Sequence, residues 1–171
     1  MDGFGKAEPL GKVLVIGGCG FLGSHIVEGL DACDASISIL DFRSGQQVHT
    51  RPDIKYYDSD ITSLDAILPV FEKGEFDVVI HTVSPLFLDG TDAEFQRVNV
   101  GGTKNIIEAA QRTGVKALVY TSTAIVVQNN FDMPIANADE SWPIFSGADQ
   151  EDDYARSKVS FHLPRSLLVR C

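Results

Sequence analysis

The chain has 171 residues, of which 44% are hydrophobic and 22% charged, and its formal net charge is −10. This composition is typical of one soluble globular α/β domain with its own core, and it excludes a disordered chain. A surface this acidic repels phosphate backbones, so nucleic acid is not an expected partner.

The first predicted elements are a strand, a glycine-rich turn and a helix. Residues 12–17 (KVLVIG) are apolar and β-branched, which predicts a strand buried on both faces of a parallel sheet. The turn ends at Gly23, and the spacing of apolar residues predicts a helix over 24–30. Further strands are predicted over 36–41 and 55–57.

The alternation of strand and helix continues along the chain. The later predicted elements are a helix over 63–73 with Ser63 as N-cap, a strand over 76–81, a helix over 95–112 and a strand over 117–121. Residues 128–153 are predicted as a loop, after which a helical pattern resumes at Tyr154. This order predicts the α/β class: a doubly wound parallel sheet, or Rossmann fold.

The glycine-rich turn predicts a dinucleotide site. Gly17, Gly20 and Gly23 follow the first buried strand and open the first helix. Glycine permits the tight turn and a close approach of the backbone to a pyrophosphate, and the helix N-terminus offers unpaired N–H groups to the phosphates.

Asp41 closes the second strand, 18 residues after Gly23. An acid at this place accepts hydrogen bonds from the ribose hydroxyls of the adenosine and repels a 2′-phosphate, which favours NAD over NADP as the cofactor. Arg43 is the competing feature, because a nearby arginine can pair with the extra phosphate.

Tyr154 and Lys158 lie four residues apart, on one face of a predicted helix. A lysine cation beside a tyrosine is expected to lower the pKa of the phenol, so that it can serve as an acid or a base towards a carbonyl or an alcohol. Ser122 and Thr123 follow the last predicted strand, at the edge where such sheets bind ligands.

Together these motifs resemble the extended short-chain dehydrogenases. The resemblance depends on the order and spacing of the following features: the glycine turn, Asp41, Asp60-Ile61, HTVS (81–84), NVGGT (99–103), YTST (120–123) and YARSK (154–158). Within that superfamily, LVYTSTAIVV (118–127) and NVGGTKN (99–105) are most similar to the 3β-hydroxysteroid dehydrogenases, and especially to the sterol-4α-carboxylate 3-dehydrogenase (decarboxylating) group.

The resemblance implies a role for each matching residue. Tyr154 is the acid/base, Lys158 is its partner and a ribose ligand, Thr123 orients the substrate with Ser122 beside it, and Asn99 supports the active-site hydrogen bonds. The implied cofactor contacts are Gly17, Gly20, Phe21, Leu22, Gly23, Asp41, Asp60, Ile61, Val83, Ser84, Tyr154 and Lys158. His81 is either a strand cap or part of the site.

The C-terminal residues depart from the family pattern. Residues 159–171 do not resemble the continuation of the Tyr154 helix, and Pro164 would interrupt it. We therefore expect an N-terminal tail (1–11), an NAD-binding Rossmann domain (12–158) and an atypical C-terminal tail (159–171) that marks a probable truncation, with the substrate domain largely missing.

The implied function is NAD-dependent oxidation of a 3β-hydroxyl on a sterol-like substrate, with C4 decarboxylation where the substrate carries a carboxylate. A nucleotide-sugar epimerase or dehydratase, a dihydroflavonol-type reductase and an NAD-binding fragment without turnover are the alternatives. No metal site is expected, because His25, His49, His81 and His162 are scattered. A leader and a membrane segment are not expected either. The expected location is cytoplasmic, with peripheral attachment to the endoplasmic reticulum as an alternative, and a homodimer is an assembly that the resemblance allows.

Overall fold

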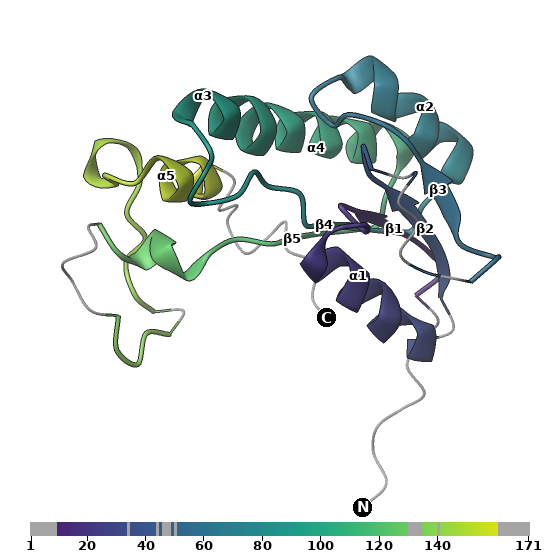
Figure 1. Cartoon of the computed structure of the whole chain (residues 1–171), viewed down its shortest axis with the longest axis horizontal. Helices are drawn as coiled ribbons and strands as arrows, with labels where there is room; N and C mark the ends of the chain where they lie inside the picture. The colour runs from purple at the N-terminus through teal and green to yellow at the C-terminus, as the bar shows by residue number, and fades with distance from the viewer. Residues whose placement is uncertain are drawn as a thin grey trace, which may run out of the picture.

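Five parallel strands form a sheet in the order β3-β2-β1-β4-β5 (Figure 1). The computed structural model describes residues 10–33, 35–43, 45, 49, 51–129, 135–139 and 141–160. The strands are β1 (Lys12–Ile16), β2 (Ser36–Leu40), β3 (Lys55–Tyr57), β4 (Val78–His81) and β5 (Ala117–Tyr120). The strand order reverses direction beside β1, which pairs with both β2 and β4. The predicted fold class is confirmed, and this reversal is the switch point at which α/β sheets bind ligands.

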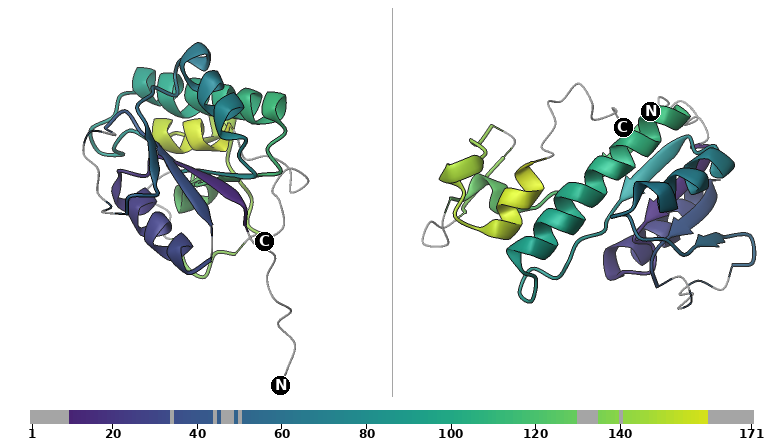
Figure 2. Two further views of the ribbon diagram at one scale, coloured as in Figure 1. Left: turned by 90° about the vertical axis from the view of Figure 1, so that its right-hand side faces the viewer. Right: turned by 90° about the horizontal axis from the view of Figure 1, so that it is seen from above.

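Helices cover both faces of the sheet, with α1 on one face and α2 and α4 on the other (Figures 1 and 2). The α-helices are α1 (Phe21–Leu30), α2 (Leu64–Gly74), α3 (Asp92–Glu94), α4 (Thr103–Thr113) and α5 (Asp153–Val159). Short 3₁₀ turns lie at Asp31–Cys33, Ala124–Val127 and Gly147–Asp149. Helix α5 lies beyond one end of the sheet, next to the start of the long α3–α4 helix (Figure 2).

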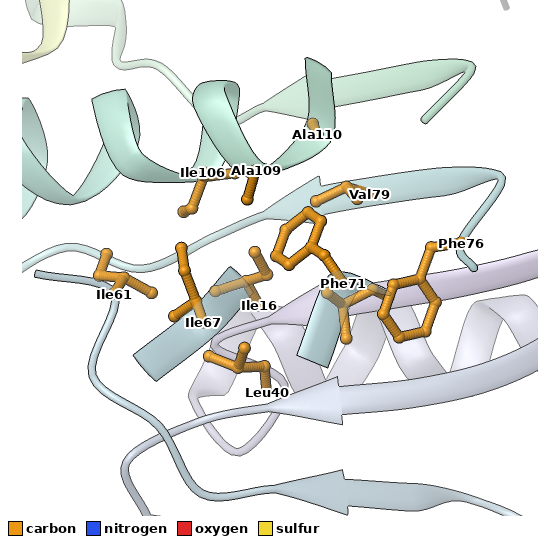
Figure 3. Close-up of a cluster of buried hydrophobic side chains, with 11 residues drawn as sticks. Ile16, Leu40, Ile61, Ile67, Phe71, Phe76, Val79, Ile106, Ala109 and Ala110 are labelled. Carbon is orange, nitrogen blue, oxygen red and sulfur yellow. The ribbon is translucent and has the colours of Figure 1, made fainter. Parts of the chain in front are cut away.

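Two apolar clusters hold these layers together. The larger one lies between the sheet and helices α2 and α4, and Figure 3 shows Phe71 beside Val79 of β4 and Ile106 pointing towards Ile67 of α2. The smaller one joins the other face of the sheet to α1 through Val27 and Leu30. Full burial of a side chain such as Phe71 stabilises the fold by about 1.5–3 kcal/mol. The site is therefore built on a rigid sheet.

Element boundaries differ from the sequence-based expectations in two informative places. Helix α1 begins at Phe21 instead of residue 24, because the Ser24 N–H already donates to the Gly20 carbonyl. The helix predicted over 95–112 begins earlier, at Asp92, where Thr91 and Glu94 form a capping box. The next residues, Phe95–Gly102, form a π-helix. The turn of a π-helix is wider than that of an α-helix, so an apolar periodicity of 3.6 residues does not predict it.

The segment before α5 is a loop in its described part, as expected, apart from the Gly147–Asp149 turn. Helix α5 starts at Asp153 because the Asp152 carboxylate caps it, accepting a hydrogen bond from the Ala155 N–H at 2.6 Å. Pro164 and residues 161–171 lie outside the described residues, as do residues 1–9. Within the described part of the chain, no helix combines the length and apolar character that crossing a membrane requires.

Candidate cofactor site and active site

The glycine turn between β1 and α1 requires its glycines for steric reasons. Gly17 adopts φ +88°, and a Cβ atom there would lie 2.6 Å from the Thr82 hydroxyl oxygen. A Cβ on Gly23 would lie 2.2 Å from the Gly17 carbonyl oxygen. No side chain caps the N-terminus of α1 at Gly20. The turn therefore brings bare backbone and the positive end of a helix to the sheet edge, as an anionic pyrophosphate requires.

Two adjoining cavities follow this edge of the sheet. The first, of about 350 Å³, extends from the glycine turn to the loop after β4. The second, of about 220 Å³, extends from Asp41 to the loop after β3. Both are lined by Asp41 and Val83. The predicted cofactor residues that line the first cavity are Gly17, Gly20, Phe21, Leu22, Gly23, Asp41, Val83 and Ser84, and Asp60 and Ile61 line the second.

Asp41 is buried between the two cavities, and its carboxylate holds the turn in place. One oxygen accepts a hydrogen bond from the Cys19 N–H at 3.1 Å, and the other accepts from the Arg43 N–H at 3.0 Å. Arg43 lies beside this carboxylate, 3.5 Å away, with its guanidinium over the Phe42 ring. A carboxylate offers about four lone-pair directions, so Asp41 can still accept from a ribose hydroxyl.

Asp60 and Ile61 form the far wall of the second cavity in different ways. Ile61 is buried in the core, and Asp60 is exposed, where it accepts a hydrogen bond from the Thr62 N–H at 2.9 Å. Arg97 of the π-helix approaches Asp60 to 3.8 Å. This wall is apolar on one side and charged on the other, a combination that suits the face and edge of an adenine ring.

Tyr154 lies on α5, with the rings of Phe87 and Phe95 packed edge-on against it at centroid distances of 5.3 and 5.4 Å. Burial raises the pKa of its phenol, and a side-chain hydrogen bond with Ser84 acts in the opposite direction. The expected lowering of the Tyr154 pKa by Lys158 is therefore wrong for this structure. The lysine nitrogen lies 5.8 Å from the ring centroid, and desolvation is the largest influence on the Tyr154 pKa.

Lys158 is almost fully buried, on the same face of α5. Its ammonium donates a hydrogen bond to the Thr121 carbonyl at 3.3 Å and lies 5.0 Å above the centroid of the Tyr120 ring. Burial lowers the pKa of Lys158 to about 8. Of the predicted catalytic pair, the lysine is thus the group that is poised to change charge near neutral pH.

Asn99 connects the long helix to α5. Its amide donates to the Ser157 hydroxyl at 2.9 Å, and that hydroxyl donates to the Tyr154 carbonyl at 2.7 Å. The Asn99 side chain is buried, and its Oδ1 atom has no hydrogen-bond partner within the described part of the chain. Asn99 therefore positions the backbone that carries Tyr154.

Ser122 and Thr123 follow β5 at the same edge of the sheet. Thr123 caps the Ala124–Val127 turn by accepting a hydrogen bond from the Ile125 N–H at 3.4 Å, and Ser122 is exposed. A hydroxyl that accepts one hydrogen bond keeps its own proton for donation. Both residues therefore retain the donor that holding a substrate oxygen requires.

His81 is part of a buried hydrogen-bond network at the end of β4. This position is compatible with both a strand cap and a part of the site. Its Nδ1 accepts from the Val83 N–H at 3.3 Å, so the proton lies on Nε2, which donates to the Thr103 hydroxyl at 3.0 Å. Burial, and secondarily the charge of Lys158, lower the pKa of His81 to about 3. The imidazole is therefore neutral.

Sequence reasoning missed several residues of the two cavities and of the lysine environment. Phe42 and Arg97 belong to no motif, and Tyr120 and Thr82 belong to matched motifs but were assigned no role. Phe42 and Tyr120 lie at the carboxyl ends of β2 and β5, and Arg97 lies on the helix after β4. These positions are the signal that could have marked them as site residues, because α/β sheets bind ligands at this edge. The missed residues are Phe42, Ser59, Thr82, Leu86, Arg97, Val98 and Tyr120. Within the described residues, no group of three metal-ligating side chains occurs.

The parallel sheet with its switch point, the glycine turn and the buried acid after β2 together define a Rossmann-type dinucleotide-binding domain. The sequence profile of the 3-beta hydroxysteroid dehydrogenase/isomerase family matches residues 14–160. The chain belongs to this family, whose members are oxidoreductases.

Curated relatives agree with this assignment. The sterol-4-alpha-carboxylate 3-dehydrogenase (decarboxylating) of Schizosaccharomyces pombe is 44% identical over 139 residues, which are 80% of this chain and 40% of the relative. The 3 beta-hydroxysteroid dehydrogenase/Delta 5-->4-isomerase of Mycobacterium tuberculosis is 36% identical over 88% of this chain and 40% of its own length. The chain thus spans about 40% of the length of these relatives.

Solved structures share the fold. The Thermus thermophilus UDP-glucose 4-epimerase, in complex with NAD, is 28% identical with a TM-score of 0.71, over 88% of this chain and 48% of that one. The Campylobacter jejuni UDP-Glc/GlcNAc 4-epimerase is 24% identical with a TM-score of 0.74, over 87% of this chain and 46% of that one. The second likeness concerns the fold alone.

Proposed function

We propose that this chain binds NAD in the two adjoining cavities and carries the catalytic residues for oxidation of a 3β-hydroxyl on a sterol-like substrate. The observation that supports this most directly is the Lys158–Thr121 hydrogen bond, because it joins the helix that carries Tyr154 to the carboxyl end of β5. The cofactor cavities lie along this same edge of the parallel sheet.

The chain's own residues have the following proposed roles. Deprotonated Tyr154 accepts the proton of the 3β-hydroxyl, Lys158 balances the resulting charge and binds the ribose, and Thr123 with Ser122 holds the substrate oxygen. The bound NAD supplies the acceptor for the hydride that leaves C3. In a 4-carboxysterol, the 3-ketone then accepts the electron pair of the C4–carboxylate bond as carbon dioxide departs.

A third cavity supports an apolar substrate. It has a volume of about 480 Å³ and lies beside Tyr154, lined by Phe87, Leu88 and Phe95 and also by the acids Glu151, Asp152 and Asp153. Leu88 is 87% exposed on the loop after β4. The aromatic and aliphatic side chains suit a hydrocarbon ring system, and the neighbouring carboxylates disfavour a sugar diphosphate. The decarboxylating reaction is proposed because relatives such as that of S. pombe carry this activity in their names.

Two other functions are candidates. The chain's likeness to the T. thermophilus epimerase favours a nucleotide-sugar epimerase as the second candidate. Binding of NAD without turnover is the third, and the turnover assay below separates it from the other two. The same proposal includes three further points. The chain is divided into a tail, a domain over 12–158 and a second tail. Its location is cytoplasmic or associated with the endoplasmic reticulum, and it forms a homodimer.

The experiment that tests the cofactor step is a titration with NADH and NADPH, followed by nicotinamide fluorescence and thermal stability. Asp41→Asn is expected to weaken NADH binding about tenfold or more, because a charge-assisted hydrogen bond contributes about 1.5–3 kcal/mol. Asp65→Asn, at an exposed acid in α2, is the matched control. Unchanged NADH affinity in Asp41→Asn would contradict the assigned site.

Turnover then separates the candidate functions. Formation of NADH from NAD and a 3β-hydroxysterol, abolished in Tyr154→Phe, is the expected result. Loss of carbon dioxide from the 4α-carboxysterol would add the decarboxylation step. Turnover of a UDP-sugar alone would identify the epimerase function, and saturable binding without any turnover would identify the cofactor-binding function.

A further inference from the structure

The ring of Tyr120 lies directly under the ammonium group of Lys158. The nitrogen is 5.0 Å from the ring centroid, within the roughly 6 Å at which a cation and an aromatic face attract each other. Within the described residues, this nitrogen also contacts the Thr121 carbonyl at 3.3 Å and the Tyr154 ring at 5.8 Å. No carboxylate forms an ion pair with Lys158 within the described residues.

A buried ammonium without a carboxylate partner is expensive, because burial disfavours the charged form. The ring face of Tyr120 and a single carbonyl are the groups that offset this cost on the side of β5. The titratable groups around Lys158 are Tyr154 on α5, Tyr120 on β5 and His81 on β4. His81 is neutral, so none of them supplies a fixed negative charge.

Tyr120 is packed against β4. It pairs with His81 in the β4–β5 register, and the two rings lie 5.4 Å apart between centroids. Burial raises the pKa of the Tyr120 phenol, and a side-chain hydrogen bond with Thr103 acts in the opposite direction. The ring face is the part of Tyr120 that contacts the lysine.

We propose that Tyr120 is a positioning residue of the catalytic pair: its ring face holds the Lys158 ammonium charged and in place at the end of β5, next to Tyr154. This proposal rests on the proposed function, because it assigns Lys158 a catalytic role. A positive charge near Tyr154 favours its tyrosinate form, whereas burial of the phenol disfavours it. A ring that keeps the lysine charged would therefore partly offset the effect of burial.

The test measures the pKa of Lys158 directly, in the full chain, by NMR titration of ¹³C-labelled lysine side chains. The Lys158 resonance is assigned as the one that disappears in Lys158→Arg. In Tyr120→Leu, the pKa of Lys158 is expected to fall by about one unit, because a desolvated cation–π contact is worth up to about 2 kcal/mol. In Tyr120→Phe, which keeps the ring, the shift is expected to be less than about a third of that.

Phe76→Leu is the matched control, since it removes a buried aromatic ring at the opposite end of the sheet. It is expected to lower stability without changing the Lys158 pKa. If Tyr120→Leu fails to fold, phenylalanines with one, two and three fluorines at position 120 keep the ring's shape while weakening its face potential. The Lys158 pKa should then fall stepwise with fluorination. An unchanged Lys158 pKa across the series, or in a folded Tyr120→Leu, overturns the proposal.

These outcomes are independent of turnover. A stepwise fall of the Lys158 pKa in a chain that oxidises no sterol would retain the positioning role and reject the sterol reaction. If turnover occurs, Tyr120→Leu should move the acidic limb of the kcat/KM profile to higher pH, and Tyr120→Phe should leave it in place. A loss of activity with no change in the profile would indicate a merely structural role and would contradict the proposal.

Discussion

The Asn99 amide lies 2.9 Å from the Ser157 hydroxyl, although 58 residues separate them in the chain. This hydrogen bond joins the π-helical stretch Phe95–Gly102 to the helix that carries Tyr154 and Lys158. The position of the proposed acid/base therefore depends on the long helix as well as on its own.

Replacement of Asn99 tests this dependence. In Asn99→Ala, the free energy of unfolding is expected to fall by about 1–3 kcal/mol, because the buried Ser157 hydroxyl loses its donor. Any turnover should fall more than cofactor affinity does, since the glycine turn is untouched. Urea denaturation and NADH titration measure the two effects. Gln111→Ala, on the exposed face of α4, is the control, and equal effects of the two variants would argue against this link.

Arg43 is expected to influence the choice between NADH and NADPH. Its guanidinium lies over Phe42 at the mouth of the first cavity, where a 2′-phosphate would extend past Asp41. In Arg43→Ala, NADPH affinity should fall about tenfold or more and NADH affinity less than threefold, because the arginine pairs with the extra phosphate alone. Fluorescence titration measures both, with Arg112→Ala as the control. Equal losses for both cofactors would mean that Arg43 acts only by orienting Asp41.

Lys158 is expected to reduce stability at neutral pH. Its pKa falls to about 8 in the folded chain from 10.5, so the unfolded chain binds more protons between these values. The free energy of unfolding should therefore rise with pH across that window, and the burial cost below pH 8 is about 3 kcal/mol. Lys158→Met should be more stable at pH 7, should show no such rise, and should lack activity.

Denaturation at pH 7 to 10 checks this prediction. Lys104→Met, at an exposed lysine of α4, is the matched control and should keep the rise seen in the wild-type chain. A Lys158→Met variant that is less stable than the wild-type chain at pH 7 would show that the lysine's contacts outweigh its desolvation.

His81 is expected to make the chain sensitive to acid. Because burial lowers its pKa to about 3 from 6.5, the unfolded chain takes up a proton in this window before the folded chain does. Stability should therefore be lost as pH falls from 6.5 towards 3. His81→Gln should show a flatter profile between pH 6.5 and 4.5, above the range in which most carboxylates titrate. Thermal unfolding against pH measures the slope, and His25→Gln, at an exposed histidine of α1, should keep it. A steep slope in His81→Gln would assign the sensitivity to other groups.

Much of the fold is predictable from local patterns. The apolar run of β1, the glycines after it and the acid after β2 each have a local physical cause, namely burial on two faces, a tight turn and a strand end. The helix boundaries are less predictable. Helix α1 begins three residues early because backbone hydrogen bonds, rather than side-chain spacing, decide where a helix starts.

The placement of the candidate cofactor residues is also largely predictable, since they lie at strand ends that a parallel sheet brings to one edge. Phe42 and Arg97 were missed because their relevance comes from the cavity they border. The pKa of Tyr154 was predicted in the wrong direction, because desolvation is the largest influence on it and the lysine nitrogen is 5.8 Å from the ring centroid.

Local sequence accounts for the strand–helix alternation, the glycine turn, the acid after β2 and the four-residue spacing of Tyr154 and Lys158. Each of these depends on residues close together in the chain. Long-range packing places Tyr120 under Lys158 and Asn99 next to Ser157, and it leaves Lys158 without a carboxylate ion pair within the described residues. These contacts depend on how β5, the long helix and α5 pack, and a buried side chain takes its charge from whatever that packing places around it.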